Sequence, residues 1–523
     1  MTLDATLAVL LRIGLWMAGI AGAVLAYELL RASVLRRVRL RLERSVSQYL
    51  ARHRVRLDRF KFTHKHYIRE ALLADPALNE FMVAQSRETG TPVTELALRA
   101  EEYIEEIVPY FNLVSYYKVG YGIARPLMRL LYDVEFSRTN LASAESEQPG
   151  RTATVYVMNH RSNADYVLFA VCMSRQVALS YAVGEWARVW PLETLFKSFG
   201  SYFVRRGEKD PLYHRTLQRY VQLVTAGGLT QGIFIEGGLS RDGHFRTPKV
   251  GLLDSLLGVT EDGGDVRFVP VGLNFDRVLE DRNLLREAAG KVEEPDAVDK
   301  ARSLAWLLFA LPKAALARIW GLVASVWRVA RRRWHGFGVA AVHAGPPVSF
   351  REFFGDDGLE ALRALDRAGR RVELERFATE LMDRIGREVP VTAIPVAALA
   401  MDRAGAFTAE GGLETAVVKE ISELLAQMRG QGAPVILGPG LAGLAAERSA
   451  VEDEASGAGR PLLDLTADMI SGEEAEAVWE VARGMLGGRG ALVRRDRRVF
   501  VPEWAADLVR YYAYSLDGHV ADE

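Results

Sequence analysis

Short apolar runs of strand-like composition recur between residues 152 and 344, and this feature constrains the fold most strongly. The runs are TVYVM, ALSYAV, YFV, GIFI, RFVPVGL and GVAAVHA. They alternate with helical stretches, of which PLYHRTLQRYVQLVTAG is an example. Since such alternation is typical of helices packed on a mixed sheet, we predict an α/β fold whose functional loops lie at the strand ends.

Length and composition indicate how many further regions the chain can form besides this sheet. The chain has 523 residues, of which 49% are hydrophobic, enough for roughly two to four structural units. We predict the mixed-sheet domain at residues 146–390 and a basic, helical region before it at 31–145. An apolar helix is expected at 1–30, and an Ala- and Gly-rich helical or α/β region at 391–523.

The overall charge and the cysteine content exclude several functions. Lys and Arg number 66 against 67 Asp and Glu, so the net charge is -1 and no nucleic-acid partner is expected. Cys172 is the only cysteine, which excludes an intramolecular disulfide and a zinc site built on a cysteine cluster. Such a chain suits a reducing compartment.

An apolar segment followed by a basic one predicts attachment to a membrane. Residues 5–27 carry a single charge, Arg12, whereas residues 31–69 carry 13 Lys or Arg against Glu43 and Asp58. At about 1.5 Å per helical residue, the apolar segment can cross a hydrocarbon core of about 30 Å. By the positive-inside rule, the bulk of the chain then lies on the cytoplasmic side.

Two other interpretations of the apolar segment compete with this one. The small residues at 21–23 resemble a signal-peptide cleavage site, but no basic region precedes the apolar run and a dense one follows it. An ordinary buried helix stays open as an alternative, because Arg12 and Glu28 weaken the span.

A second segment has the composition of a membrane-surface helix. Residues 300–351 contain no Asp or Glu and hold four of the nine tryptophans, Trp306, Trp320, Trp327 and Trp334. Basic residues are spread among Leu, Ala and Val over the same stretch. We expect residues 303–334 either to lie in the lipid headgroup layer or to form a core helix packed on the sheet.

A formal dinucleotide-binding pattern lies near the C-terminus. Residues 438–443 form GxGxxG, with Asp464 about 20 residues further on. Pro439 removes a backbone donor from the loop, and no second mononucleotide unit follows. We therefore interpret the pattern as a Gly-rich turn before a helix.

The segment TVYVMNHRSNADYVLFA carries the clearest chemical signal. A predicted strand ends at Asn159, His160 follows, and Asp165 begins a new apolar helix. Five steps along one helix rotate about 140°, so these two side chains can meet only across a strand-to-helix turn. There Asp165 can accept the Nδ1 proton of His160 and leave Nε2 as a general base, while a turn residue should contribute little to the core. His53 and Asp58 have the same spacing without a preceding strand, and we interpret that pair as chance.

Basic residues follow two more strand-like runs downstream. The first block is GSYFVRR at residues 200–206, and the second is FIEGGLSR at residues 234–241. Because the ends of neighbouring strands meet at one sheet edge, we expect Arg206 and Arg241 to converge beside a Gly turn. Two planar guanidinium groups in that position would form a phosphate clamp.

These blocks together resemble the glycerolipid acyltransferases, and among them the bacterial membrane-bound glycerol-3-phosphate acyltransferases. The resemblance spans residues 131–278 and is carried by HRSNADY, GSYFVRRGEKDPLY, FIEGGLSRDG, PKVG and VPVGLNFDRV. The segment LVRYYAYSL is similar to the C-terminus of that family. There are departures, since Leu239 replaces the usual Arg of EGGRSR and Asn163-Ala164 replaces the His-Met of HRSHMD.

The resemblance implies an enzyme in which His160 and Asp165 are catalytic. It implies substrate-binding roles for residues of the downstream blocks, which are Gly200, Phe203, Arg205, Arg206, Glu236, Gly237, Ser240, Arg241 and Lys249. The implied reaction moves a fatty acyl group to the sn-1 hydroxyl of sn-glycerol 3-phosphate. Its co-substrate is acyl-CoA or acyl carrier protein, with no metal and no bound cofactor. The implied location is the cytoplasmic face of a bacterial inner membrane, in contact with membrane lipid.

Several alternative functions stay open from the sequence. The acceptor could be lysophosphatidate or dihydroxyacetone phosphate, the same base could hydrolyse the thioester with water, or the protein could be an inactive membrane scaffold. Intact His160 and Asp165 favour an enzyme, and the predicted phosphate clamp favours a phosphorylated acceptor over water. The oxyanion donor that acyl transfer requires is not identified.

Overall fold

The computed structural model describes residues 65–112, 116, 120–137, 152–174, 176–177, 179–184, 192–205, 207–290, 336–438, 441 and 461–520, together with Ser33. The predicted membrane helix at 1–30, the segment at 303–334 and the pair His53 and Asp58 lie outside these residues. Among the helices that are described, none combines the length and apolar character needed to cross a bilayer.

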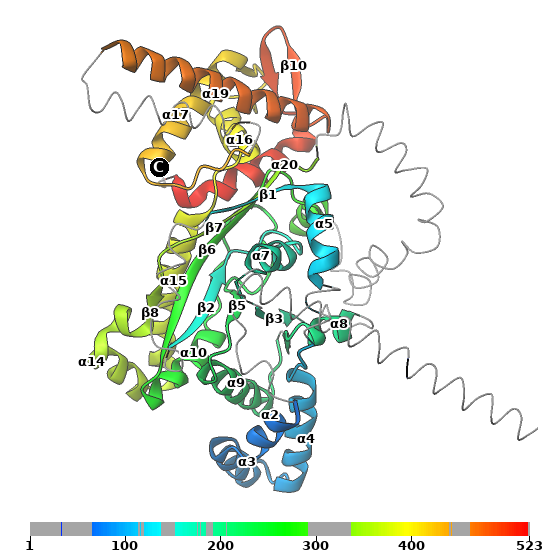
Figure 1. Ribbon diagram of the computed structural model, residues 1–523, viewed down its shortest axis with the longest axis vertical. Coiled ribbons are helices and arrows are strands. Elements are labelled where there is room, and N and C mark those ends of the chain that lie inside the picture. The colour runs from blue at the N-terminus through cyan, green and yellow to red at the C-terminus, as the bar shows by residue number, and fades with distance from the viewer. Residues whose placement is uncertain are drawn as a thin grey trace, which may run out of the picture.

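An eight-stranded mixed sheet forms the centre of the molecule (Figure 1). Its strands are β1 (Asp133–Ser137), β2 (Thr152–Met158), β3 (Ser180–Gly184), β4 (Tyr202–Val204), β5 (Gln231–Phe234), β6 (Asp265–Phe275), β7 (Val339–Ala344) and β8 (Val348–Ser349). The order is β1-β7-β6-β2-β5-β3-β4, and β8 pairs with β6. Parallel pairing links β6, β2, β5, β3 and β4, whereas β7 is antiparallel to β6. The predicted mixed α/β fold is confirmed, and each predicted apolar run coincides with a strand.

One strand lies where the sequence predicts helix. Residues 31–145 are expected to be helical, but Asp133–Ser137 forms β1 directly after helix α5 (Tyr121–Leu131). This strand pairs in parallel with β7, from Asp133 opposite Val339 to Ser137 opposite His343. Its backbone partner is therefore remote in sequence, so nothing in the local pattern marks it as a strand.

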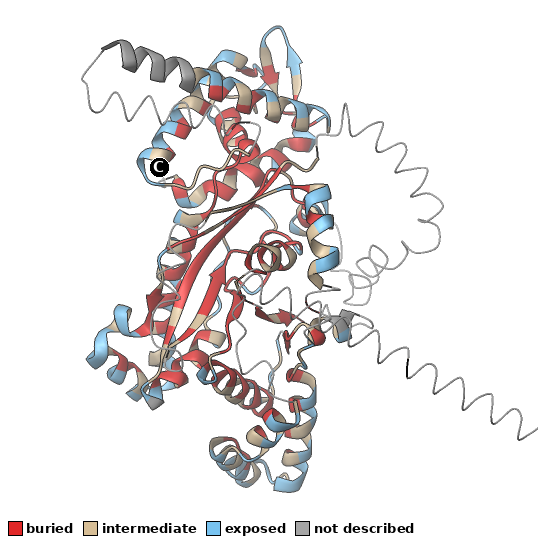
Figure 2. Ribbon diagram, viewed as in Figure 1, coloured by how far each residue is buried: buried red, intermediate tan, exposed pale blue. Residues whose placement is uncertain are grey.

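Alternate residues along the central strands pack into two different hydrophobic layers. On β2, Tyr156 and Met158 belong to one cluster, and Val155 and Val157 belong to the other. Helices contributing to the first cluster are α7 (Asp165–Met173), α16 (Ala393–Arg403) and α20 (Glu503–Ala513). Those contributing to the second are α9 (Pro211–Ala226), α10 (Gly251–Leu257) and α15 (Arg367–Glu388). Figure 2 shows the resulting buried sheet between its helical layers.

Residues beyond 391 share the first of these clusters with the sheet. Their elements are α16, β9 (Gly412–Leu413), α17 (Glu414–Gly430), α19 (Pro461–Gly487), β10 (Val493–Arg495), β11 (Arg498–Phe500), α20 and the 3-10 helix η5 (Tyr514–His519). Val271 of β6 and Tyr512 of α20 lie in the same cluster, so one core joins the two regions. The domain boundary at 390 stays a prediction. Gly438 is described, with a φ of 95°, but most of the GxGxxG pattern lies outside the described residues.

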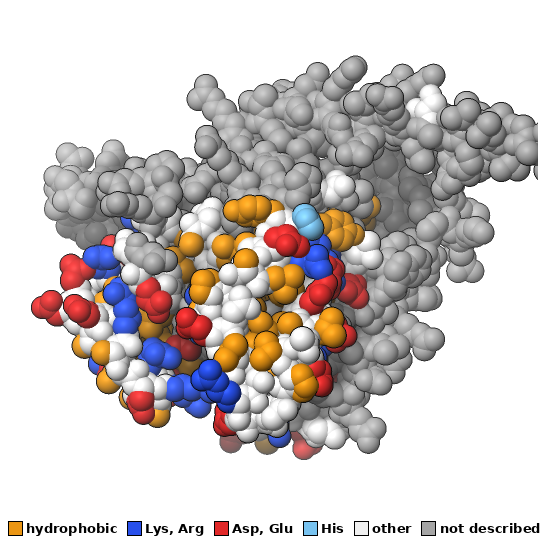
Figure 3. Space-filling view, turned by 90° about the horizontal axis from the view of Figure 1, so that it is seen from below, with side chains coloured by type: hydrophobic (Ala, Val, Ile, Leu, Met, Phe, Trp, Pro, Cys, Tyr) orange, Lys and Arg blue, Asp and Glu red, His pale blue; other side chains and the backbone are white. Residues whose placement is uncertain are grey.

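The N-terminal helices α2 (Lys65–Leu73), α3 (Pro76–Thr89) and α4 (Val93–Ile107) pack beside α9. Asp210 caps α9 by accepting a hydrogen bond from the backbone N–H of Leu212, and it also accepts one from the Tyr103 hydroxyl on α4 at 2.5 Å. Asp75 caps α3 and binds Arg219 of α9 at 2.7 Å. Viewed from this end, acidic and basic side chains are interspersed over the described surface (Figure 3).

The remaining described elements connect these layers. They are α8 (Leu192–Ser198), the 3-10 helix η4 (Gly258–Asp262), α11 (Asp281–Ala288) and α14 (Phe350–Ala364).

Candidate active site

The candidate site is built on the turn between β2 and α7, called here the His160 turn (residues 159–164). Asn159 extends the sheet beyond β2, because its side chain both donates to the Leu273 carbonyl at 2.9 Å and accepts from the Leu273 N–H at 2.8 Å. The turn therefore starts from a fixed point at the carboxyl end of β2. Helix α7 begins at Asp165, six residues after Asn159, so the carboxyl group of Asp165 lies at the end of the turn.

The structure brings His160 and Asp165 into contact. Nδ1 of His160 lies 2.9 Å from Oδ2 of Asp165. The same oxygen accepts hydrogen bonds from the backbone N–H groups of Arg161 at 2.7 Å and Ser162 at 2.9 Å. This arrangement holds the carboxylate and the imidazole in one orientation, with Nδ1 occupied by the carboxylate and Nε2 left for a reacting group.

The ring of His160 is packed rather than exposed. It stacks on Phe234 with centroids 4.1 Å apart and meets Tyr166 edge-on at 5.4 Å, and the residue is only 3% exposed. The expectation that this turn residue contributes little to the core is therefore wrong. The turn folds back over the end of β5, so an aromatic wall encloses the base.

Glu236 fixes the backbone of the His160 turn from the neighbouring strand. One carboxyl oxygen accepts from the His160 N–H at 2.8 Å, and the other accepts from the Arg246 N–H at 2.9 Å. Burial raises the pKa of Glu236 to about 7, while these backbone hydrogen bonds act in the opposite direction. Ser240 adds a further link, since its N–H donates to the His160 carbonyl at 2.8 Å. Glu236 and Ser240 thus bind the backbone of the His160 turn, and the substrate-binding role expected for them stays a prediction.

A buried arginine ties the same turn to the C-terminal helix. Arg161 donates to the backbone carbonyls of Gly243 and Tyr511, both at 3.1 Å. Its guanidinium carbon lies 4.7 Å from the centroid of the Tyr511 ring, whose hydroxyl donates back to the Arg161 carbonyl at 3.3 Å. Gly243 has a φ of 103°, and a Cβ there would lie 2.3 Å from the Tyr511 carbonyl oxygen. The backbones of Gly243 and Tyr511 therefore lie in close contact, and the guanidinium group of Arg161 bridges their carbonyls.

Glu280, just after β6, holds the far end of the His160 turn. It accepts hydrogen bonds from the Ser162 hydroxyl at 2.9 Å and from the Asn163 N–H at 2.6 Å. Burial raises the pKa of Glu280, and these two donors oppose the shift. The turn is consequently fixed at both ends by carboxyl groups that follow the two strands flanking β2.

The predicted phosphate clamp is described only in part. Arg206 lies outside the described residues. Arg241 is half-buried, and its Nε lies 3.3 Å from a carboxylate oxygen of Glu287 on α11. The guanidinium carbon of Arg205 lies 5.2 Å from the ring centroids of both Tyr103 and Tyr213. The same group binds Glu106 and Glu208, at 2.6 and 2.8 Å. These contacts attach β4 to the N-terminal helices, and substrate binding by these arginines stays a prediction.

The remaining predicted residues occupy two places. Gly200, with a φ of 82°, and Phe203 lie at β4, which β5 and β3 separate from β2. Gly237, with a φ of 66°, lies directly after β5, where a Cβ would meet the side chain of Lys249 at 2.9 Å. The described contacts therefore join Gly237 and Lys249 to the loop that follows β5 but do not join Gly200 and Phe203 to the dyad.

Sequence reasoning missed Arg161, Phe234, Glu280 and Tyr511 as parts of this site. Two signals were available, because Phe234 opens the FIEGGLSR block and Tyr511 lies in LVRYYAYSL. The contacts themselves could not be predicted, since Arg161 and Tyr511 are 350 positions apart. Within the described ranges, no group of three His, Cys, Asp or Glu side chains could hold a metal ion.

Comparison with known proteins agrees with this geometry. Residues 125–274, which include β2, the His160 turn and β5, match the family model described as Acyltransferase. The chain is 25% identical over 340 residues to a glycerol-3-phosphate acyltransferase of Xylella fastidiosa (strain M12), which covers 63% of this chain and 36% of that protein. Residues 125–274 are thus similar to the Acyltransferase family.

Another similar protein has the same name. A glycerol-3-phosphate acyltransferase of Aeromonas hydrophila is 27% identical over 266 residues, covering 49% of this chain and 32% of that protein. The chain thus spans about a third of the length of the curated relatives it matches. A crystal structure of the 1-acyl-sn-glycerophosphate acyltransferase of Thermotoga maritima aligns at 16% identity over 61% of this chain and 98% of that one, with a TM-score of 0.27. That superposition is too poor to bear on the fold.

Proposed function

We propose that the protein transfers a fatty acyl group from an acyl thioester to the sn-1 hydroxyl of sn-glycerol 3-phosphate, giving lysophosphatidate. The observation that carries the proposal is the contact of His160 Nδ1 with Asp165 at the carboxyl end of β2. The relatives named glycerol-3-phosphate acyltransferase support this choice of acceptor. Lysophosphatidate and dihydroxyacetone phosphate are the competing acceptors.

In this mechanism His160 is the general base. Nε2 takes the proton of the acceptor hydroxyl as its oxygen forms a bond to the thioester carbonyl carbon. The carbon–sulfur bond then breaks, and the leaving thiolate takes the proton back from His160, so that ester and free thiol are the products. A positioned base of this kind contributes roughly 100- to 10,000-fold in rate. No protein nucleophile and no resident cofactor are needed, because the thioester is already activated.

The proposal includes the donor and the location of the reaction. Acyl-CoA or acyl carrier protein supplies the acyl group, and the membrane provides both a surface for the reaction and an outlet for the lipid product. The apolar segment at 5–27 with the basic residues after it supports attachment at the cytoplasmic face of a bacterial inner membrane.

The decisive experiment measures thiol release by purified protein in detergent, with and without sn-glycerol 3-phosphate. We expect release that depends on this acceptor and that His160→Ala abolishes, with lysophosphatidate as the product. Release without acceptor would indicate a thioesterase, and a lack of release with every acceptor would indicate a scaffold. Because His160 stacks on Phe234, the same variant should lose roughly 1 to 3 kcal/mol of stability, so its fold must be checked by thermal unfolding.

A further inference from the structure

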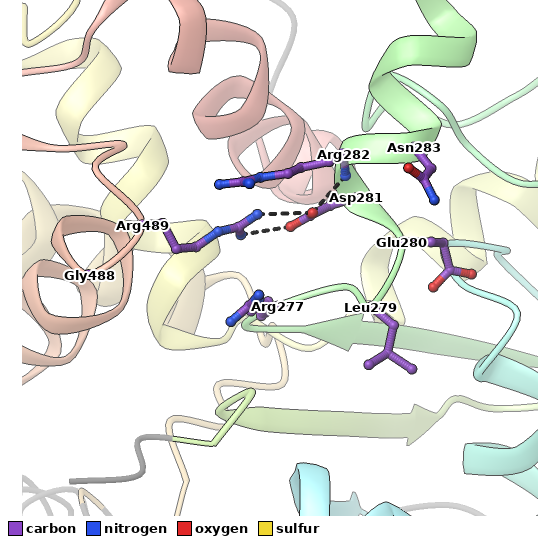
Figure 4. Close-up of a pocket in the computed structure, with 8 residues that line it drawn as sticks. All are labelled: Arg277, Leu279, Glu280, Asp281, Arg282, Asn283, Gly488 and Arg489. Carbon is purple, nitrogen blue, oxygen red and sulfur yellow. Dashed lines mark hydrogen bonds and ion pairs between the residues drawn. The ribbon is translucent and has the colours of Figure 1, made fainter. Parts of the chain in front are cut away.

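A polar pocket of about 410 Å³ lies beside the His160 turn, and none of the residues discussed so far except Glu280 lines it (Figure 4). We call it the arginine pocket; it is formed by residues 277 and 279–283, which follow β6, and by residues 488 and 489, which follow α19. Strands β6 and β2 are parallel neighbours, so their carboxyl ends lie at the same edge of the sheet. Glu280 lines the pocket and also binds Ser162 and Asn163 of the turn. The pocket is therefore contiguous with the candidate active site.

One cation of the pocket is neutralised by the protein itself. Arg489 is 9% exposed and donates two hydrogen bonds to the carboxylate of Asp281, at 2.7 and 3.0 Å. The Tyr512 hydroxyl occupies the same carboxylate at 2.5 Å. Asp281 is thus fully engaged, whereas Nε of Arg489 is buried without a hydrogen-bond partner among the described residues.

Two further cations line the pocket without a carboxylate of their own. In the part of the chain that the structure describes, the guanidinium groups of Arg277 and Arg282 make no ion pair. Arg277 lies 4.4 Å above the Phe337 ring, and its Nε is buried with no hydrogen-bond partner. Glu280, the second acid of the pocket, is engaged by the His160 turn. In Figure 4 the three guanidinium groups gather on the side of the pocket away from Glu280.

Buried guanidinium N–H groups without partners are uncommon in native structures and call for an explanation. An anion in the pocket would neutralise the guanidinium groups of Arg277 and Arg282, which line the pocket without a carboxylate of their own. Phosphate fits best, because its oxygens match the planar donor fork of arginine. A pocket volume of this size also lies in the range of small-molecule sites.

We propose that the arginine pocket binds a phosphate group of one of the reactants. This inference rests on the proposed function only for the identity of that reactant, since both the acceptor and an acyl-CoA donor carry phosphate. The pocket is separate from the predicted clamp of Arg206 and Arg241. Arg241 instead holds Glu287, further along the α11 helix that Asp281 and Arg282 begin.

The test is direct binding to the full-length protein in detergent, measured by isothermal titration calorimetry. The probes are inorganic phosphate, sn-glycerol 3-phosphate and coenzyme A. Arg277→Gln should raise the dissociation constant of at least one probe by about 10- to 100-fold, as expected for loss of a charge-assisted hydrogen bond. Arg282→Gln should weaken binding of the same probe less, because Arg282 is exposed. Arg286→Gln, an exposed change on the same helix, is the matched control and should leave binding unchanged.

The probes and the kinetics distinguish the two sources of phosphate. If the pocket holds the acceptor, Arg277→Gln should raise the KM for sn-glycerol 3-phosphate and leave that for the acyl thioester unchanged. The reverse pattern, with weaker coenzyme A binding, would assign the pocket to the donor. Arg489→Lys keeps a charge opposite Asp281 and provides a second variant if Arg277→Gln unfolds.

Unchanged binding of all three probes in folded Arg277→Gln and Arg282→Gln would overturn the proposal. So would equal weakening by Arg286→Gln, which would indicate a general charge effect. Should the wild-type protein transfer no acyl group yet bind phosphate in a manner that depends on Arg277, the proposed function would fail and the pocket would stand.

Discussion

Asp165 is the residue on which the geometry of the His160 turn depends most directly. Its Oδ2 accepts from Nδ1 of His160 and from two backbone N–H groups, and the residue is fully buried. Asp165→Asn replaces one oxygen by an N–H₂ group and removes the charge that favours a proton on the imidazole. We expect kcat to fall roughly 100- to 10,000-fold with little change in either KM. Steady-state kinetics on the folded variant would contradict this role if more than a tenth of kcat survived.

Glu236 should make the stability of the protein depend on pH. Burial raises its pKa to about 7 from an ordinary value of 4.5. Its contribution to the free energy of unfolding is therefore complete below about pH 4.5 and is lost as the pH rises through about 7. Glu236→Gln cannot titrate, so the stability difference between wild type and variant should be larger at pH 5 than at pH 8. One pKa unit corresponds to about 1.4 kcal/mol, which gives a change of up to about 3 kcal/mol.

Chemical denaturation at the two pH values measures this difference. Glu360→Gln, an exposed change on α14, is the control and should give a difference that does not vary with pH. A wild-type advantage that stays constant from pH 5 to pH 8 would show that Glu236 is ionised throughout.

Sequence reasoning succeeds for residues whose role depends on near neighbours. Five positions separate His160 from Asp165, and the strand before them and the helix after them are both visible in the apolar pattern. It fails for residues whose partners lie far along the chain. Nothing in the sequence around Arg205 indicates its carboxylate partner Glu106, which is 99 positions away.

At the scale of elements, docking of α20 should control the shape of the His160 turn. Gly243→Ala would place a Cβ 2.3 Å from the Tyr511 carbonyl oxygen, in a backbone conformation with φ of 103°. We expect α20 to be displaced, with faster hydrogen exchange over residues 503–513 and loss of transfer. Asp507→Ala is exposed on the same helix and should change neither. Normal activity together with accelerated exchange in Gly243→Ala would show that acyl transfer does not depend on the docking of α20.

The elements themselves were largely predictable, because a buried strand needs a run of apolar residues and each run leaves a local trace. Strand β1 was not, since DVEFS has no apolar run and exists as a strand through its pairing with β7. The shared core beyond residue 391 was also hidden. That Tyr512 and Val271 share one hydrophobic cluster is a property of the folded chain and leaves no periodic signal in either segment.

For the whole molecule, the membrane predictions concern residues outside the described part of the chain. Deleting residues 1–30 should weaken attachment to vesicles without abolishing it, because the basic residues at 31–69 and the segment at 303–334 would still contact anionic lipid. Flotation at low and high salt measures this, and high salt should release more of the shortened protein. If the protein without residues 1–30 is a soluble monomer at low salt in the absence of detergent, residues 303–334 belong to the core.

The contact between Arg161 and Tyr511 can form only after a delay during protein synthesis. These residues lie 350 positions apart. At about 5 to 20 residues per second, a ribosome needs about 20 to 70 s to pass from one to the other. For most of that interval the nascent chain carries His160, Asp165 and Glu236 but lacks α20, whose Tyr511 binds Arg161 of the His160 turn. A chain released early should therefore be inert, which would keep incomplete translation products from consuming acyl thioesters.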